Sequence, residues 1–351
     1  VVLWDAFETI ILPRRVTRRI RLTRLFYESI WRPWSRLVRS MTKAKRREKY
    51  LGMFGPLSLL MLLGLWALGL IVGYALILWA TKTKLNLSGA ATFESYLYLS
   101  GVTFFTLGYG DLAPVLPFGR AVVVIEAATG FGLLAIVIGY LPVLYQAFSR
   151  REVNISLLDA RAGSPSSAAE MLRRHGEAGH LSDLKGVLHE WEHWSAELME
   201  SHLSYPVLCY FRSQHDNQSW LSALTTVLDT CALVIVGVEG APAWQAKLTF
   251  AMARHAVVDI AQIFGTPPSS AKVAASRLKP GDLDRLRAVL RKSGLHLRDG
   301  EEAEQRLNEL RSMYEPYVRA LSTRLLMPLP SWIRGEDVMD NWKTSAWGRI
   351  Q

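Results

Sequence analysis

The residues at positions 106–111 read Thr-Leu-Gly-Tyr-Gly-Asp, and their main chain alone can perform one kind of chemistry. Glycine reaches positive φ without a clash at the β-carbon, so Gly108 and Gly110 can alternate in handedness with the residues between them. In such a backbone consecutive carbonyl oxygens point to the same side. A line of carbonyl oxygens can replace the water shell of a cation, and the Thr106 hydroxyl adds an innermost oxygen.

This stretch resembles the filter signature of potassium channels, in which four chains each contribute a T-x-G-Y-G segment. Only Leu107 departs from the pattern, where Val or Ile is usual. One chain supplies one quarter of each oxygen ring, so the resemblance implies a homotetramer. It also implies passive K⁺ conduction, with no enzymatic activity and no cofactor besides the permeant ion. The implied ion-binding residues are Thr106, Leu107, Gly108, Tyr109 and Gly110.

The flanking segments predict a membrane setting for these residues. No charged residue occurs from Gly55 to Ala80, and 26 residues at about 1.5 Å each give roughly 39 Å, more than the roughly 30 Å of hydrocarbon to be crossed. A second apolar run extends from Ala121 to Phe148 and is broken only by Glu126 and Pro142. Both runs predict transmembrane helices, at about 55–80 and 120–148.

The segment between the two spans has the order of a re-entrant pore loop. A short pore helix is expected at about 93–105, directly before the filter at 106–111. Non-helical backbone survives in a membrane only where protein buries it or where it lines a watery cavity, and a filter meets that condition. The resemblance to two-span, one-pore-loop bacterial potassium channels covers about 55–148, within a predicted pore domain at 51–148.

Further roles are carried over from the resemblance to the residues around the filter. Support for the filter is expected from Asp111 and from Glu126, which either hydrogen-bonds behind the filter or pairs with Arg120 of a neighbouring subunit. Several related channels brace the filter with a carboxylate at the position that Val102 occupies here, so Tyr98 is the candidate brace for Asp111.

The second span has a candidate hinge and gate. Gly130 corresponds in spacing to the hinge glycine of two-span channels, although helix packing explains a glycine there equally well. If it is the hinge, Phe131, Leu134 and Ile138 are predicted to line the cavity or the inner gate, where closure can act by dewetting.

The distribution of charge predicts the orientation in the membrane. The chain carries a net charge of +10, and residues 13–50 alone carry fourteen Lys and Arg against two Glu. Under the positive-inside rule this basic flank places the N-terminus in the cytoplasm, and two crossings return the C-terminus there. Lys and Arg are not enriched downstream, which argues against nucleic-acid binding. The predicted location is the cell membrane, as a multi-pass protein.

The basic N-terminal segment, 1–50, is predicted to form an amphipathic helix at the cytoplasmic interface. Its arginines alternate with apolar residues and can meet anionic headgroups, each contributing ~1 kcal/mol near the surface. Either it binds an acidic lipid as a regulator, or it is a topology signal and surface anchor. The candidate lipid-binding residues are Arg14, Arg15, Arg18 and Arg19.

Residues 149–351 are predicted to form an all-helical cytoplasmic domain that regulates gating in response to an unidentified ligand. One helix is expected between Gly281 and Gly294, and a longer amphipathic one at 301–325. No G-x-G-x-x-G follows a strand, and no cyclic-nucleotide barrel or EF-hand loop is recognisable. Cys209 and Cys231 are predicted to be buried free thiols.

An apolar stretch at 220–239 raises the question of a third span. Asp229 lies at its centre, and an unpaired carboxylate at the bilayer midplane costs at least ~2.5 kcal/mol, so a buried core helix is favoured.

The sequence His189-Glu190-Trp191-Glu192-His193 matches H-E-x-x-H, the pattern of a zinc site with a glutamate base. A membrane-bound zinc protease using His189, Glu190 and His193 is therefore an alternative from another class of protein. All eight histidines lie in the C-terminal part, which also raises a proton or metal sensor.

Taken together, the sequence predicts an all-α membrane protein with two transmembrane helices, a re-entrant pore helix and filter, and a helical cytoplasmic domain. A potassium-selective channel subunit is the favoured function. A weakly selective cation channel is the alternative within the same class, because selectivity depends on filter rigidity that the sequence does not reveal.

Overall fold

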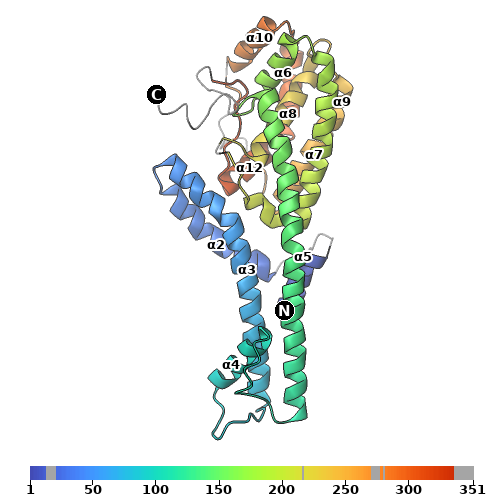
Figure 1. The fold of residues 1–351 in the computed structure, drawn as a ribbon. Helices are drawn as coiled ribbons and strands as arrows, with labels where there is room; N and C mark the ends of the chain where they lie inside the picture. Colours follow the sequence, from blue (N-terminus) through green and yellow to red (C-terminus); the bar gives the residue numbers. More distant parts are fainter. Residues whose placement is uncertain (13–20, 216, 270–276, 280, 336–351) are drawn as a thin grey trace, which may run out of the picture. The chain divides into compact units, whose positions relative to one another are not determined.

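The computed structural model describes residues 1–12, 21–215, 217–269, 277–279 and 281–335. Throughout this part of the chain the secondary structure is helical, without a β-strand and with two isolated bridges, Leu85 to Pro114 and Val238 to Leu297. The all-α fold class is therefore confirmed (Figure 1). The chain divides into two compact units. The first comprises Val1–Thr42 and Met53–Gln146, and the second Lys43–Gly52 and Ala147–Gln351.

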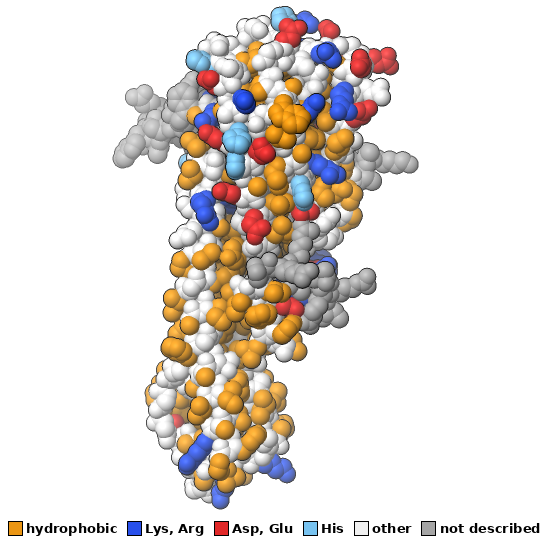
Figure 2. Space-filling model, turned by 90° about the vertical axis from the view of Figure 1, so that its right-hand side faces the viewer, with side chains coloured by type: hydrophobic (Ala, Val, Ile, Leu, Met, Phe, Trp, Pro, Cys, Tyr) orange, Lys and Arg blue, Asp and Glu red, His pale blue; other side chains and the backbone are white. Residues whose placement is uncertain are grey.

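The first unit contains the helices that belong to the predicted membrane domain. Helix α3 (Ala44–Ala80) contributes all but its first turns, and α5 (Pro117–Ala162) contributes its first part. Between them lies α4, Phe93–Phe104, where the pore helix is predicted. Figure 2 shows hydrophobic side chains covering one face of this unit with few charges among them. Helix α5 continues as one helix past Phe148 to Ala162.

The N-terminal segment folds against α3 within the first unit. It forms α1 (Val2–Ala6), a π-helical turn (Phe7–Ile11) and α2 (Leu22–Arg39). The buried Asp5 carboxylate accepts hydrogen bonds from Trp66 Nε1 of α3 at 3.0 Å and from the Thr23 amide at 3.1 Å. The predicted lipid-binding residues Arg14, Arg15, Arg18 and Arg19 lie outside the described residues. The described part of the N-terminal segment therefore packs on a membrane helix through a polar contact.

The second unit is a bundle of helices built around α8. Long-range packing joins α7 (Leu184–Ser204), α8 (Trp220–Gly237) and α9 (Ala243–Ile263), and α6 (Ala168–Glu177) lies against α8. The remaining helices are α10 (Asp282–Lys292), α11 (Glu301–Ser312) and α12 (Glu315–Leu325), with 3₁₀ turns at Leu181–Asp183 and Pro206–Tyr210. Cys209 and Cys231 are buried free thiols, as predicted, and burial raises the pKa of both.

One helix prediction is wrong in this unit. The single helix expected at 301–325 is two helices, separated at Met313 and Tyr314. Pro316 lies in the first turn of α12, where its missing amide hydrogen is tolerated, but in the middle of one long helix it would remove a hydrogen bond and clash with the preceding turn.

Three helices of the described chain are long and apolar enough to cross a membrane: α3, α5 and α8. They differ in what covers them. In the most apolar stretch of each helix, 22% of the residues of α3 and 17% of those of α5 are buried, against 89% in α8. Because protein covers nearly all of α8, it is the core helix of the second unit, which agrees with the prediction from Asp229.

Candidate functional site

The segment that follows α4 has the alternating backbone that its glycines predict. Gly108 and Gly110 have φ of +62° and +76°, and Thr106 also has a positive φ of 57°. Residues 107 and 109 between them do not. A positive φ is uncommon for a threonine, so something must hold Thr106 in place. The Thr106 amide donates to the Thr103 carbonyl at 2.9 Å, and the Leu107 amide to the Val102 carbonyl at 2.9 Å.

These residues are solvent-exposed in the single chain, whereas the helix behind them is anchored. The side chains of residues 105–111 are exposed, with Tyr109 at 68%. In contrast, Tyr96, Leu99 and Phe104 of α4 are buried against α3 and α5. The Tyr96 hydroxyl also donates to the Thr83 carbonyl at 2.8 Å. The arrangement is an exposed, strained loop on a fixed helix.

Helix α5 packs against the end of α4 at Gly130. A β-carbon on Gly130 would lie 2.0 Å from the carbonyl oxygen of Phe104, the last residue of α4, so no other residue fits there without a shift of the backbone. By comparison, a β-carbon on Gly132 would meet nothing within 4 Å. The sequence offered a hinge and helix packing as equal explanations of Gly130, and this contact gives the glycine a packing requirement.

Glu126 of α5 is fully buried behind the filter segment. The Ser100 hydroxyl of α4 contacts its Oε1, and the same hydroxyl lies 2.7 Å from the Ile71 carbonyl oxygen of α3. The predicted hydrogen bond of Glu126 within the chain is present, and the pairing with Arg120 of a neighbouring subunit stays a prediction. Arg120 instead donates from Nε to the Pro114 carbonyl at 3.2 Å.

The other predicted support and gate residues are placed as follows. Tyr98 lies close enough to Asp111 for their side chains to interact, and its role as a brace stays a prediction. Phe131, Leu134 and Ile138 are exposed on α5, with 67%, 57% and 64% of their surface accessible. Their exposure leaves them free to line a cavity.

The predicted zinc pattern does not assemble in the second unit. The His189 and His193 rings lie edge to face with their centroids 4.7 Å apart, while Glu190 pairs with Arg161 at 3.7 Å. Among the described residues no three His, Cys, Asp or Glu side chains gather as a metal site.

His202 is the buried histidine of this unit. Its Nδ1 donates to the Leu198 carbonyl at 2.8 Å, and Nε2 accepts from Arg151 at 3.3 Å. Burial, together with the Arg151 charge, holds the pKa of His202 well below its ordinary value. His202 therefore stays neutral near pH 7, which removes it from the candidate proton sensors.

Two arginines that sequence reasoning missed hold the helix ends in the second unit. Arg151, on the part of α5 beyond the apolar run, is 3% exposed and donates to the Leu208 and Phe211 carbonyls at 2.9 and 3.0 Å. Arg212 pairs with Glu48, in the first turns of α3, at 3.6 Å, and donates to the Leu325 carbonyl at 2.6 Å. The local sequence around these two residues does not indicate these contacts.

The spans, the intervening helix and the strained loop together have the form of a two-span, pore-loop channel domain. Residues 60–146 match the family model described as "Ion channel". This match supports an ion channel and agrees with the resemblance to the two-span, pore-loop family. It covers the part of the chain that contains α4, residues 106–111, Glu126 and Gly130.

A curated relative, "Uncharacterized membrane protein YdjJ" of Bacillus subtilis (strain 168), is 24% identical over 197 residues, which cover 54% of this chain. The chain spans 56% of the length of that relative. No solved structure matches the chain. The comparisons agree with the apolar helices in making this a membrane protein.

Proposed function

We propose that four copies of this chain assemble into a potassium-selective channel, with residues 106–110 of each copy forming the ion-binding rings. The observation that carries the proposal is the run of positive φ at Thr106, Gly108 and Gly110 on the exposed loop after α4. Such an alternation lets successive carbonyls face one axis, and four-fold closure would complete each ring. K⁺ would then pass between carbonyl sites without a cofactor or a catalytic step.

The alternatives have less support. A weakly selective cation channel would use the same loop, and selectivity measurements separate it from the proposal. A zinc protease would need a third ligand for His189 and His193, and none of the described side chains joins them.

Liposomes containing the purified protein test the proposal directly. We expect K⁺ flux that exceeds Na⁺ flux and that Gly108→Ala abolishes, because alanine at φ +62° costs roughly 1–2 kcal/mol per subunit and moves the carbonyls. Gly101→Ala is the matched control, because Gly101 lies within α4 and its β-carbon would meet nothing within 4 Å. Absence of flux under all activating conditions, or equal flux in Gly108→Ala, would contradict the channel.

The second unit is proposed to control gating from the cytoplasm. It holds the first turns of α3 through Arg212 and Glu48, and the end of α5 through Arg151. Burial lowers the pKa of Arg212 to about 10, and the nearby Glu48 charge opposes that shift. Any ligand that changed this unit would therefore act on both spanning helices. With the basic N-terminal flank, this arrangement favours cytoplasmic termini and contact with anionic lipids.

Removing one partner of the Arg212 pair tests this coupling. Glu48→Gln leaves the filter untouched and should change open probability by roughly two- to tenfold, because a partly buried ion pair contributes about 0.5–1.5 kcal/mol. Lys49→Gln, at an exposed position on the same turn, is the control. Unaltered gating in Glu48→Gln would argue against control through α3.

A further inference from the structure

Glu126 is buried where helices α3, α4 and α5 meet, and its carboxyl has few hydrogen-bond partners there. The side chain of Glu126 has no exposed surface, and of the described residues only Ser100 hydrogen-bonds to its carboxyl, at Oε1. Its Oε2 has no hydrogen-bond partner there. No lysine, arginine or histidine of the described chain forms an ion pair with it, and Arg120 of the same chain donates to the Pro114 carbonyl. A buried, ionised carboxylate with one neutral neighbour is among the least favourable arrangements in a protein.

The Ser100 hydroxyl cannot satisfy both of its neighbours alone. It has one hydrogen and lies against two oxygens, Glu126 Oε1 and the Ile71 carbonyl oxygen at 2.7 Å. The Ile71 carbonyl can only accept. Both contacts are hydrogen bonds if the Glu126 carboxyl carries its own proton and donates it to Ser100 Oγ, while Ser100 donates to Ile71. In that arrangement α5, α4 and α3 are joined by one directed chain of hydrogen bonds.

We propose that Glu126 is a neutral carboxylic acid and a positioning residue for the filter. The inference rests on the proposed channel function. Ser100 lies on α4 six residues before Thr106, so a chain of hydrogen bonds anchored at Ser100 fixes the helix from which the filter begins. Glu126 also lies one turn before Gly130, where α5 touches the last carbonyl of α4. Helix α5 therefore contacts α4 at two successive turns. Loss of either contact should make the filter less rigid.

Glutamine at position 126 distinguishes a neutral acid from a carboxylate. Its amide can donate to Ser100 as the acid does, so Glu126→Gln should conduct with K⁺ over Na⁺ selectivity within about twofold of wild type. Glu126→Ala and Ser100→Ala each break the chain of hydrogen bonds and should lower that selectivity roughly tenfold. A buried polar group left without a hydrogen-bond partner changes an equilibrium by a factor on the order of ten. Glu94→Gln and Glu94→Ala, at an exposed position in the first turn of α4, are the matched controls.

Infrared spectroscopy of the full-length protein gives a readout that does not require conduction. The wild-type spectrum minus that of Glu126→Gln should contain the carbonyl stretch of a protonated carboxylic acid, because all other acids cancel. A difference that shows only carboxylate bands would overturn the neutral acid, as would a loss of selectivity in Glu126→Gln equal to that in Glu126→Ala. Wild-type selectivity in both Glu126→Ala and Ser100→Ala would overturn the positioning role. Absence of flux in the wild type would count against the channel itself, and the infrared result would still decide the state of Glu126.

Discussion

Helices α5 and α8 have similar apolar composition and opposite surroundings. Their most apolar stretches have mean hydropathies of 2.4 and 1.7, yet 17% of the residues in the first are buried and 89% in the second. Within the apolar run of α5 the buried acid is Glu126, and in α8 it is Asp229. Hydropathy measures the tendency of a helix to leave water and does not say whether lipid or protein surrounds it. The hydrogen-bond partners of the two acids indicate which of the two surrounds each helix.

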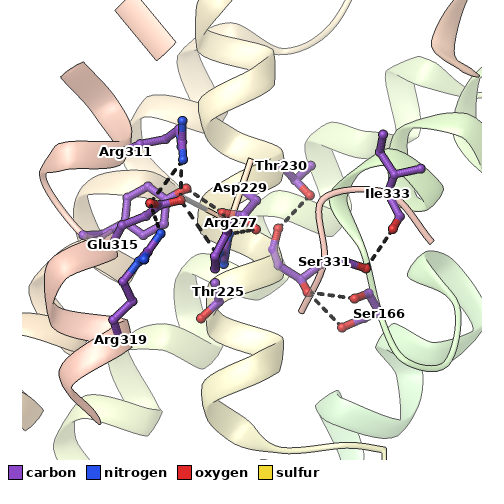
Figure 3. Close-up of polar contacts among 12 residues, drawn as sticks. Ser166, Thr225, Asp229, Thr230, Arg277, Arg311, Glu315, Arg319, Ser331 and Ile333 are labelled. Atoms are coloured by element: carbon purple, nitrogen blue, oxygen red, sulfur yellow. Dashed lines mark hydrogen bonds and ion pairs between the residues drawn. The ribbon is translucent and has the colours of Figure 1, made fainter. Parts of the chain in front are cut away.

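Asp229 has the partners of an acid in a protein core (Figure 3). Arg277 donates to its carboxylate at 2.6 Å and the Tyr314 hydroxyl at 2.5 Å. Burial raises the pKa of Asp229 to about 6, although Arg277 and Tyr314 oppose the shift. Glu126, in contrast, meets only a hydroxyl. A cation and a phenol around Asp229 are typical of an acid in the core of a helical domain. A single hydroxyl around Glu126 is typical of an acid in a membrane helix.

The sharpest way to break this comparison is to make α8 more apolar. Asp229→Leu should destabilise the protein by about 3–5 kcal/mol, because it leaves Arg277 and Tyr314 buried without their acceptor. Thermal and urea unfolding of the full chain in detergent, followed by circular dichroism, would measure the loss. Asp299→Leu, at an exposed position, is the control. If α8 crosses a membrane instead, Asp229→Leu should insert and fold better than wild type.

How much the sequence predicts differs between the two units for a physical reason. The filter loop, the helix before it and the spans depend on local features: glycine spacing, apolar length and a boundary at Phe104. Such features are written in contiguous residues. The contact of Gly130 with Phe104 depends on residues brought together by folding, and the sequence did not indicate it.

In the second unit most of the determining contacts are of that non-local kind. The helical class and the buried state of α8 were predictable, since an acid at the centre of an apolar helix signals a protein partner. The partner of Asp229 is Arg277, which lies 48 residues away in the sequence and has no local signature. The partners of Arg212, Glu48 and Leu325, are likewise far from it in the sequence.

A second test sharpens the comparison on the side of α5. Gly130→Ala places a β-carbon 2.0 Å from the Phe104 carbonyl oxygen and should cost about 3 kcal/mol, near the upper end for overpacking. Gly132→Ala has open space and should be close to neutral. Thermal unfolding in detergent, read beside K⁺ flux, separates two roles for Gly130. A hinge would change flux and leave stability alone, whereas a packing contact should lower both.

The smallest expected effect concerns α6, which covers α8. Glu170 accepts from Arg173 and Arg174, each at 2.7 Å, and its carboxylate lies 3.9 Å from Arg334. Burial raises the pKa of Glu170, but the arginines outweigh it and lower the pKa to about 2 from an ordinary 4.5. Since the folded state holds the carboxylate more tightly ionised than the unfolded state does, its contribution is complete above about pH 4.5. It is lost as pH falls toward 2.

Glu170→Gln should therefore remove roughly 1–2 kcal/mol at pH 7, after allowance for the partly exposed arginines, and almost nothing near pH 2. Unfolding curves of wild type and variant should converge across that interval. Glu177→Gln, whose partner Arg173 is shared but whose side chain is 48% exposed, should change stability much less. A constant difference from pH 7 to pH 2 would mean that Glu170 acts through packing of α6 on α8, and that its charge has no part in covering that helix.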